Sequence, residues 1–457
     1  MRIRLECSLA VKEIADALGG SAENIKTEEI THIVTDSRKA RHGDLFFPLK
    51  GERFDGEDFV PDAISRGALA VSRRHGNNII TASTAEDALL LTAKLYKRKL
   101  SSLRATVAIT GSVGKTTTKE FTKIILSQKY RVHATRGNEN NAVGVPYTLL
   151  SAPKYCEVLV CELGMNHIGE ISALSKCIEP NIGVITNIGT AHIGNLGNRE
   201  QIAKAKLEIL DGMKDGTVIV PSEEALTQGF KGRKSLSLGT ENANAKVIIK
   251  EETDAGILFD YKSDIENING LFLKIPGQHI LSCLSFGIYA SQLLGASSND
   301  ISSAISNING DILRQKYINV LDFRIYDDTY NSSPEAVKAC ISSIRRTSGG
   351  RFSVLLGDML ELGEKSRTIH FEIGKFIGAS GAIRLYTLGE FGDEIAAGAM
   401  HSGMSREQIF VNGSNAHEAA ASSIIDNHEC GETILFKGSH AMRLSRVIEL
   451  IKRYSGG

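Results

Sequence analysis

The sequence has no excess charge of either sign and no long apolar run. Lys plus Arg and Asp plus Glu are equal at 53 each, so no overall field would draw the chain to nucleic acid or to an anionic membrane surface. No apolar stretch reaches the roughly 20 residues that span a bilayer. We therefore expect no nucleic-acid partner and no membrane insertion, and any phosphate binding must depend on a local site.

The N-terminus and the cysteines exclude further classes. Charged residues interrupt the apolar pattern of residues 1–20, among them Glu6, Lys12, Glu13 and Asp16. They argue against a signal peptide and favour an amphipathic helix. Seven cysteines without CxxC spacing argue against a disulfide framework or structural zinc. We expect a cytoplasmic protein, because that compartment is reducing, and a monomer.

A chain of 457 residues exceeds what one hydrophobic core serves, and we expect three α/β domains. Residues 1–83 mix short strand-like runs with helical pieces, which predicts a small substrate-binding domain. In residues 84–313, apolar runs alternate with helical segments, and this predicts a doubly wound parallel sheet. The same alternation in residues 314–457 predicts a Rossmann-like C-terminal domain.

The apolar runs give the expected positions of strands and helices. Strands are predicted at 30–34, 44–48, 68–72, 105–110, 157–162, 181–186, 217–221, 320–327, 352–357, 384–388 and 433–436. Helices are predicted at 84–99, 284–294 and 301–308. The polar stretch 239–269 is interpreted as a hairpin extension of the second domain.

A phosphate-binding loop is the most specific local signal. The run TGSVGKTTT at 110–118 follows an apolar strand and opens a helix. Its glycines let backbone amides approach phosphates, Lys115 can reach the terminal phosphates, and the Thr116 hydroxyl can ligate Mg²⁺. The expected nucleotide contacts are Thr110, Gly111, Ser112, Val113, Gly114, Lys115, Thr116 and Thr117.

The loop is a shortened variant, because the generic pattern has a glycine where this chain has Ile109. An ordinary glycine-containing turn between a strand and a helix is the alternative interpretation. The strand, the glycine pair, the lysine and the hydroxyl pair occur in the order that phosphate binding requires, which favours the loop.

The shortened loop and three later motifs resemble the central domain of the Mur ligase and folylpolyglutamate synthetase superfamily. The motifs are GNENNAVGVP at 137–146, ELGM at 162–165 and TNIGTAH at 186–192, and their order and spacing also agree. The resemblance implies an ATP-dependent amide ligase that uses Mg²⁺. It also implies that the central domain is the ATPase domain.

The resemblance assigns roles to single residues. It implies that Lys115 is catalytic, that Glu162 and His192 bind metal together with Thr116, and that Lys206 is a carbamylated lysine which also ligates metal. Without the resemblance, Lys206 would be interpreted as a solvated helix lysine, and Glu162 and His192 as structural residues.

The C-terminal domain contains a second segment that resembles a nucleotide contact of the family. Arg314 and the run DDTYNSSP at 327–334 carry the resemblance, which implies that Arg314, Asp328 and Asn331 contact ATP. A turn that only caps the next helix is the alternative, and the two roles need not exclude each other.

Two segments narrow the resemblance to the branch that adds D-alanyl-D-alanine to UDP-N-acetylmuramoyl-tripeptide. They are LGDMLELG at 356–363 and FKGS at 436–439, and the DNPR signature of the diaminopimelate- or lysine-adding branch is absent. Segments 35–39 and 43–51 resemble the family's UDP-substrate segments. The implied substrate contacts are Ser37, Arg38, Lys50, Asn138, Asn140 and Asn141.

One departure concerns the nucleotide base. At GQHILSC, 277–283, the family usually has asparagines where this chain has Ile280 and Cys283. Those asparagines are associated with adenine recognition, and apolar groups cannot replace their hydrogen bonds. We therefore expect base selectivity to be relaxed or supplied by other residues.

The implied activity is amide ligation through an acyl phosphate, giving a UDP-muramoyl-pentapeptide for peptidoglycan synthesis. Two alternatives stay open at this point. The chain is another Mur ligase or a folylpolyglutamate synthetase-type ligase, or it is a nucleotide-dependent binding protein without ligase activity.

Overall fold

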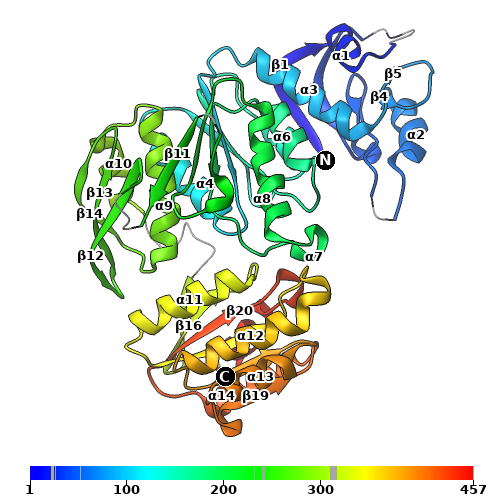
Figure 1. The fold of residues 1–457 in the computed structure, drawn as a ribbon. Coiled ribbons are helices and arrows are strands. Elements are labelled where there is room, and N and C mark those ends of the chain that lie inside the picture. The colour runs from blue at the N-terminus through cyan, green and yellow to red at the C-terminus, as the bar shows by residue number, and fades with distance from the viewer. Residues whose placement is uncertain are drawn as a thin grey trace.

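Successive β-sheets organise the chain, as Figure 1 shows. The computed structural model describes residues 1–21, 25, 27–51, 53–230, 232–238, 242–308 and 316–455. The N-terminal sheet lies at one end of the molecule, the central sheet in the middle, and the C-terminal sheet with its helices on the far side of the central one. Within these described ranges, no helix is long and apolar enough to cross a membrane.

The N-terminal sheet has the order β1-β2-β3-β4-β5, with β1 antiparallel to β2 and the other pairs parallel. Its strands are β1 (Arg2–Ala10), β2 (Glu29–Val34), β3 (Leu45–Phe46), β4 (Leu69–Ser72) and β5 (Ile79–Thr81), and its helices are α1 (Val11–Leu18) and α2 (Val60–Ser65). The strands predicted at 30–34, 44–48 and 68–72 are confirmed in kind, with shifted ends.

The helix expected over residues 1–20 is wrong in its first half, which forms β1. Ile3, Leu5 and Leu9 are buried and alternate with more exposed polar residues. That period of two suits a strand, whose successive side chains point to opposite faces. Only residues 11–18 are helical.

The central sheet has the order β14-β13-β12-β11-β10-β9-β6-β8-β7. Its strands are β6 (Ala105–Thr110), β7 (Val132–Ala134), β8 (Val158–Glu162), β9 (Ile182–Ile185), β10 (Thr217–Pro221), β11 (Arg233–Ser237), β12 (Ala245–Thr253), β13 (Gly256–Ser263) and β14 (Ile268–Leu273). Pairing is parallel from β7 to β12 and antiparallel from β12 to β14. The expected hairpin extension is therefore part of the same sheet.

Helices cover both faces of the central sheet, which confirms the doubly wound arrangement. The helices of this part of the chain are α3 (Ala85–Lys99), α4 (Lys115–Leu126), α5 (Gly144–Leu150), α6 (Glu170–Ile178), α7 (Ile193–Leu196), α8 (Arg199–Leu207), α9 (Gln278–Leu293) and α10 (Ser298–Ser306). Val107 and Ile109 of β6 pack in one apolar cluster with α4 and α9. Ala108, between them, packs in the cluster on the opposite face.

The C-terminal sheet has the order β15-β16-β20-β17-β18-β19, with only the edge strand β15 antiparallel in the described part. Its strands are β15 (Lys316–Val320), β16 (Phe323–Asp328), β17 (Phe352–Gly357), β18 (Leu385–Leu388), β19 (Ile409–Asn412) and β20 (Thr433–Lys437). Its helices are α11 (Pro334–Thr347), α12 (Ser366–Ala379), α13 (Gly392–His401), α14 (His417–Asn427) and α15 (Ser445–Ser455).

Most of the strand predicted at 320–327 is β16, whereas its first residues are the end of β15 and the tight turn between the two strands. Leu321 occupies the turn with a φ of 51°, a left-handed conformation that leucine rarely adopts. The boundaries expected at 83/84 and 313/314 stay a prediction. Helix α3, which begins at Ala85, packs against α1 of the first sheet and against α5 and α6 of the central part.

Candidate active site

The phosphate loop connects β6 to α4 at the carboxyl edge of the central sheet. Gly111 has a φ of 147° and Gly114 a φ of 83°. A Cβ on Gly111 would lie 1.9 Å from Thr186 Oγ1, and one on Gly114 would lie 2.7 Å from Cys283 Sγ. Glycine is therefore required at both positions for conformation and for space. Lys115 begins α4, and its Nζ donates to the Gly111 carbonyl at 2.8 Å.

A second segment, residues 186–192, supports the loop from the neighbouring strand β9. Asn187 Oδ1 accepts hydrogen bonds from the backbone amides of Ser112 and Val113, both at 2.9 Å. Gly189 N donates to Ser112 Oγ at 2.9 Å, and Thr186 Oγ1 donates to the Val113 carbonyl at 2.6 Å. These contacts fix the loop in shape before any ligand binds.

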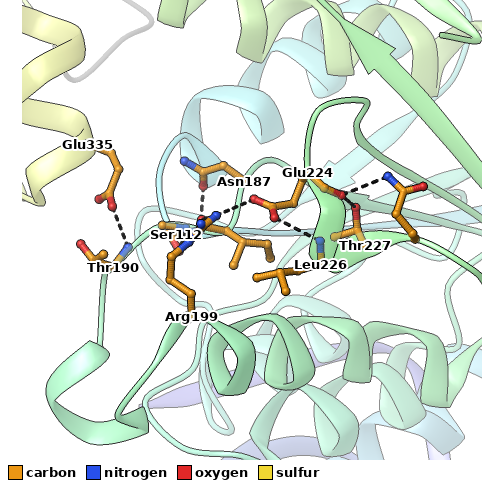
Figure 2. Close-up of polar contacts among 11 residues, drawn as sticks. Ser112, Asn187, Thr190, Arg199, Glu224, Leu226, Thr227 and Glu335 are labelled. Carbon is orange, nitrogen blue, oxygen red and sulfur yellow. Dashed lines mark hydrogen bonds and ion pairs between the residues drawn. The ribbon is translucent and has the colours of Figure 1, made fainter. Parts of the chain in front are cut away.

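Figure 2 shows that Arg199 in turn contacts the 186–192 segment. Arg199 Nη2 donates to the Ile188 carbonyl at 3.0 Å and to Glu224 Oε2 at 2.8 Å. The other oxygen of Glu224 accepts from Leu226 N at 3.2 Å. Arg199 thus connects the 186–192 segment, which supports the phosphate loop, with the turn after β10.

Glu162 is the last residue of β8 and is buried beside the loop. Asn140 Nδ2 donates to its Oε1 at 2.8 Å, and its backbone N–H donates to Thr135 Oγ1 at 3.0 Å. Its Oε2 is buried and has no hydrogen-bond partner within the described residues. An unsatisfied buried carboxylate oxygen is costly in a stable fold and therefore points to a ligand.

Lys206 is not the solvated helix lysine of the alternative interpretation. Its side chain, on the last turn of α8, is only 1% exposed. Burial, with a smaller effect of the Lys115 charge, lowers the pKa of Lys206 well below its usual value. Burial and the Lys115 charge, and no carboxylate, are the influences on its ammonium group in the part of the chain that the structure describes. These conditions favour a neutral amine, the form that reacts with carbon dioxide.

His192 lies just before α7 with a φ of 65°, and it contacts the C-terminal part of the chain. Its Nδ1 lies 2.6 Å from Glu361 Oε2, and the hydrogen bond lowers the pKa of Glu361. Gly194 N donates to the Glu361 carbonyl at 3.0 Å. Among the described side chains, no three His, Cys, Asp or Glu residues gather as a ready metal site.

The 327–334 segment caps helix α11, and the residue that follows it contacts the 186–192 segment. Ser333 Oγ accepts from Ala336 N at 3.3 Å and Pro334 begins α11, so the capping interpretation is confirmed. Asp328 is buried against Lys437. Glu335 Oε1 accepts from Thr190 N at 2.9 Å, as Figure 2 shows. Arg314, also expected to contact ATP, lies outside the described residues.

The expected substrate residues of the first domain lie around η1 (Ser37–Lys39) and after β3. Ser37 is buried, and its hydrogen bond to Asp62 lowers the pKa of that carboxyl group. Arg38 is exposed and paired with Asp36, which lowers the pKa of Asp36 to about 2. Lys50 is exposed on the same part of the chain.

The three asparagines at 138–141 occupy different environments. Asn138 is exposed, whereas Asn140 is bound to Glu162. Asn141 Oδ1 accepts from Val143 N at 3.1 Å and from Gly144 N at 2.9 Å, which caps α5. Their assignment to substrate binding stays a prediction, and the structure gives the second and third a local role.

Cys283 and Ile280 are both buried on α9. Burial raises the pKa of the Cys283 thiol to about 11. Cys283 therefore fills the space behind Gly114 as a small apolar group. Nothing on these two side chains reproduces the two amides that the family usually has there.

Asn187, Glu335, Glu361 and Lys437 were not among the sequence candidates. Each lies inside a motif that the resemblance singled out or directly beside one. The motifs indicate that these segments belong to the site, but they do not indicate which side chain in each segment makes the long-range contact.

A phosphate loop at the carboxyl edge of a parallel sheet, next to a buried carboxylate and a buried lysine, defines a nucleotide-dependent enzyme of the P-loop class. Three family profiles then match along the chain: "Mur ligase family, catalytic domain" at 29–105, "Mur ligase middle domain" at 109–290 and "Mur ligase, glutamate ligase domain" at 314–440. The chain belongs to the Mur ligase family.

Relatives match over nearly the whole length. The UDP-N-acetylmuramoyl-tripeptide–D-alanyl-D-alanine ligase of Bacillus subtilis (strain 168) is 36% identical over 453 residues, covering 96% of this chain and 97% of the relative. A crystal structure of MurF from Acinetobacter baumannii has a TM-score of 0.87 at 28% identity, and the match covers 98% of this chain and 100% of that structure's chain. The structure of MurF from Thermotoga maritima in complex with ADP has a TM-score of 0.76 at 28% identity, and the match covers 93% of this chain and 97% of that structure's chain.

Proposed function

We propose that this protein joins D-alanyl-D-alanine to UDP-N-acetylmuramoyl-tripeptide at the expense of ATP and forms the UDP-muramoyl-pentapeptide. The observation that carries the proposal is the match to a ligase of that name over 96% of the chain. The match includes all three sheets, so it covers the loop, the buried carboxylate and the C-terminal segment together. A shared nucleotide domain alone would not distinguish the acceptor.

The chemistry has two steps, and both balance without a protein nucleophile. A carboxylate oxygen of the tripeptide attacks the γ-phosphorus of ATP, the bond to the β-phosphate oxygen breaks, and ADP leaves. The free amine of D-alanyl-D-alanine then attacks the acyl carbon, loses a proton and displaces phosphate. Lys115, at the N-terminus of α4, is placed to stabilise the transferred phosphoryl group.

The residues present fit a magnesium ion. Mg²⁺ prefers oxygen ligands, is usually held by one or two carboxylates and takes other ligands from water and substrate phosphates. The unsatisfied oxygen of Glu162 and the hydroxyl of Thr116 match that preference, and the family resemblance adds His192 and a carbamylated Lys206 to the proposed ligands. When bound, the ion would offset the repulsion between the carboxylate and the γ-phosphate.

Carbamylation of Lys206 is supported by its surroundings. A buried ammonium group without a carboxylate partner is unstable as a cation. Reaction of the neutral amine with carbon dioxide replaces it by a carboxylate, which the nearby Lys115 would attract. The modified side chain would then supply oxygen ligands where the unmodified one cannot.

The proposed setting is the cytoplasm, with the protein acting as a monomer. All seven cysteines are free thiols, and most are buried, which suits a reducing compartment. None of them is needed as a nucleophile, since the acyl phosphate is attacked by the substrate amine.

The deciding experiment is mass analysis of the product formed from UDP-N-acetylmuramoyl-tripeptide, D-alanyl-D-alanine and ATP. The expected product is the pentapeptide with one phosphate released per amide bond. Phosphate release with other Mur acceptors, or with folate and glutamate, but not with this pair would reject the proposal in favour of a related ligase. Nucleotide binding without product from any acceptor would favour a binding protein.

A further inference from the structure

A buried ion pair in the C-terminal sheet includes Asp328 and contacts Asn331, two of the three residues that are expected to contact ATP. Lys437 is the last residue of β20 and is 2% exposed. Its Nζ donates to the carboxylate of Asp328 and, at 3.0 Å, to the backbone carbonyl of Asn331. Cys340 Sγ from α11 donates to the same Asp328 oxygen at 3.1 Å.

Strand register explains why these groups meet. Strands β16 and β20 are parallel neighbours, and Asp328 pairs with Lys437 where both strands end. The chain then turns through Asn331 to the N-terminus of α11. That edge faces the central sheet, since Glu335 on the first turn of α11 reaches Thr190. Lys437 therefore fixes the position of the turn on the side of the C-terminal sheet that faces the 186–192 segment.

The charge balance argues for more than packing. Although burial lowers the pKa of Lys437, the opposing charge of Asp328 more than offsets this and raises it above its usual value, so the lysine is a cation. An unpaired Asp328 would place a buried negative charge on the edge where a polyanionic nucleotide is expected. The lysine neutralises that charge, and its bond to the Asn331 carbonyl fixes the turn in advance of binding.

We propose that Lys437 is a positioning residue for the nucleotide: its ammonium group holds Asp328 and the Asn331 backbone in the arrangement that binds ATP. The proposal rests on the proposed function in one respect, namely that the 327–334 segment contacts ATP. It assigns Lys437 no contact with the reacting atoms.

The test compares Lys437→Met and Lys437→Gln with Cys340→Ala. Glutamine keeps a donor for Asp328 but loses the charge, and it remains informative where the methionine variant fails to fold. Cys340→Ala removes the other group on the same Asp328 oxygen and leaves both bonds of Lys437 intact. Ser353→Ala is a second control, because Ser353 Oγ on β17 donates at 2.6 Å to Glu432, which precedes β20 and lies at the other end of that strand from Lys437.

The first readout is the affinity for MgADP measured by titration calorimetry, with thermal unfolding as the check on folding. We expect Lys437→Met to weaken the affinity by about tenfold or more, which corresponds to about 1.4 kcal/mol, and Lys437→Gln to lie between it and the unmodified protein. Both controls should lower the unfolding temperature while they change the affinity by less than about twofold.

The second readout is steady-state kinetics, in which the KM for ATP should rise while the KM for the UDP-tripeptide stays within about twofold. Equal MgADP affinities for the lysine variants and the unmodified protein would overturn the proposal, as would an equal loss in Cys340→Ala. Since ADP binding needs no acceptor, it tests Lys437 even if the proposed acceptor pair is wrong.

Discussion

Replacement of Asn140 by alanine tests whether that side chain orients Glu162 or binds substrate. Its Nδ2 is the one side-chain donor to Glu162 Oε1 in the described part of the chain, at 2.8 Å, and the other carboxylate oxygen has no partner. The variant therefore leaves a buried carboxylate without a side-chain hydrogen bond. Loss of a hydrogen bond to a charged group costs roughly 1.5–3 kcal/mol.

That cost should appear as a weaker affinity for Mg²⁺. Removal of a group that orients a metal ligand typically weakens metal affinity or activity by about 10–100-fold. We expect the Mg²⁺ concentration for half-maximal ligation to rise in that range for Asn140→Ala. The KM for UDP-N-acetylmuramoyl-tripeptide should stay near its original value.

Asn141→Ala is the matched comparison, because Asn141 is the next residue and caps α5. Loss of a helix cap costs about 1 kcal/mol, so this variant should unfold at a lower temperature and keep its Mg²⁺ dependence. An Asn140→Ala variant with normal Mg²⁺ dependence but a raised KM for the tripeptide substrate would refute the orienting role. It would support the substrate-binding role that the sequence predicts.

Three further predictions use the same ligation assay. Lys206→Ala should abolish ligation, and full activity with or without bicarbonate would contradict the metal role of a carbamate. Cys283→Asn, which restores an amide behind Gly114, should raise the preference for ATP over GTP; an unchanged kcat/KM ratio would mean that other groups select the base. Glu335→Ala removes a charged acceptor from Thr190 N and should loosen the C-terminal domain by roughly 1.5–3 kcal/mol, visible as a larger radius of gyration in scattering, whereas Glu335→Gln should loosen it less.

The local features of the fold and site could be predicted because their signals are contiguous. The loop at 110–118 needs only a strand, two glycines, a lysine and a helix start in order, and the structure has all of them. The strand β1, where a helix was predicted, also has a local signal, because buried and exposed residues alternate over residues 2–10. The charged residues Arg4 and Glu6 lie on the exposed face of that strand, so they fit the period of two and do not indicate a helix.

Contacts between distant segments could not be predicted in the same way. Ser112 and Asn187 are separated by 75 residues, Asp328 and Lys437 by 109, and Thr190 and Glu335 by 145. Each pair meets only because of strand order and the placement of the C-terminal domain, which no local period encodes. The turn at Leu321 and Asp322 contains no glycine, and a single aspartate inside an apolar run is a weak sign that one strand ends and another begins.

The 186–192 segment connects the phosphate loop with the C-terminal domain through adjacent residues. Asn187 and Gly189 hold the loop, whereas Thr190 and His192 are bound by Glu335 and Glu361 from the other domain. A ligand that changes the conformation of the loop therefore acts on the same 186–192 segment that the C-terminal domain contacts. Since such coupling is reciprocal in free energy, docking of that domain must change phosphate affinity by the factor with which phosphate changes docking.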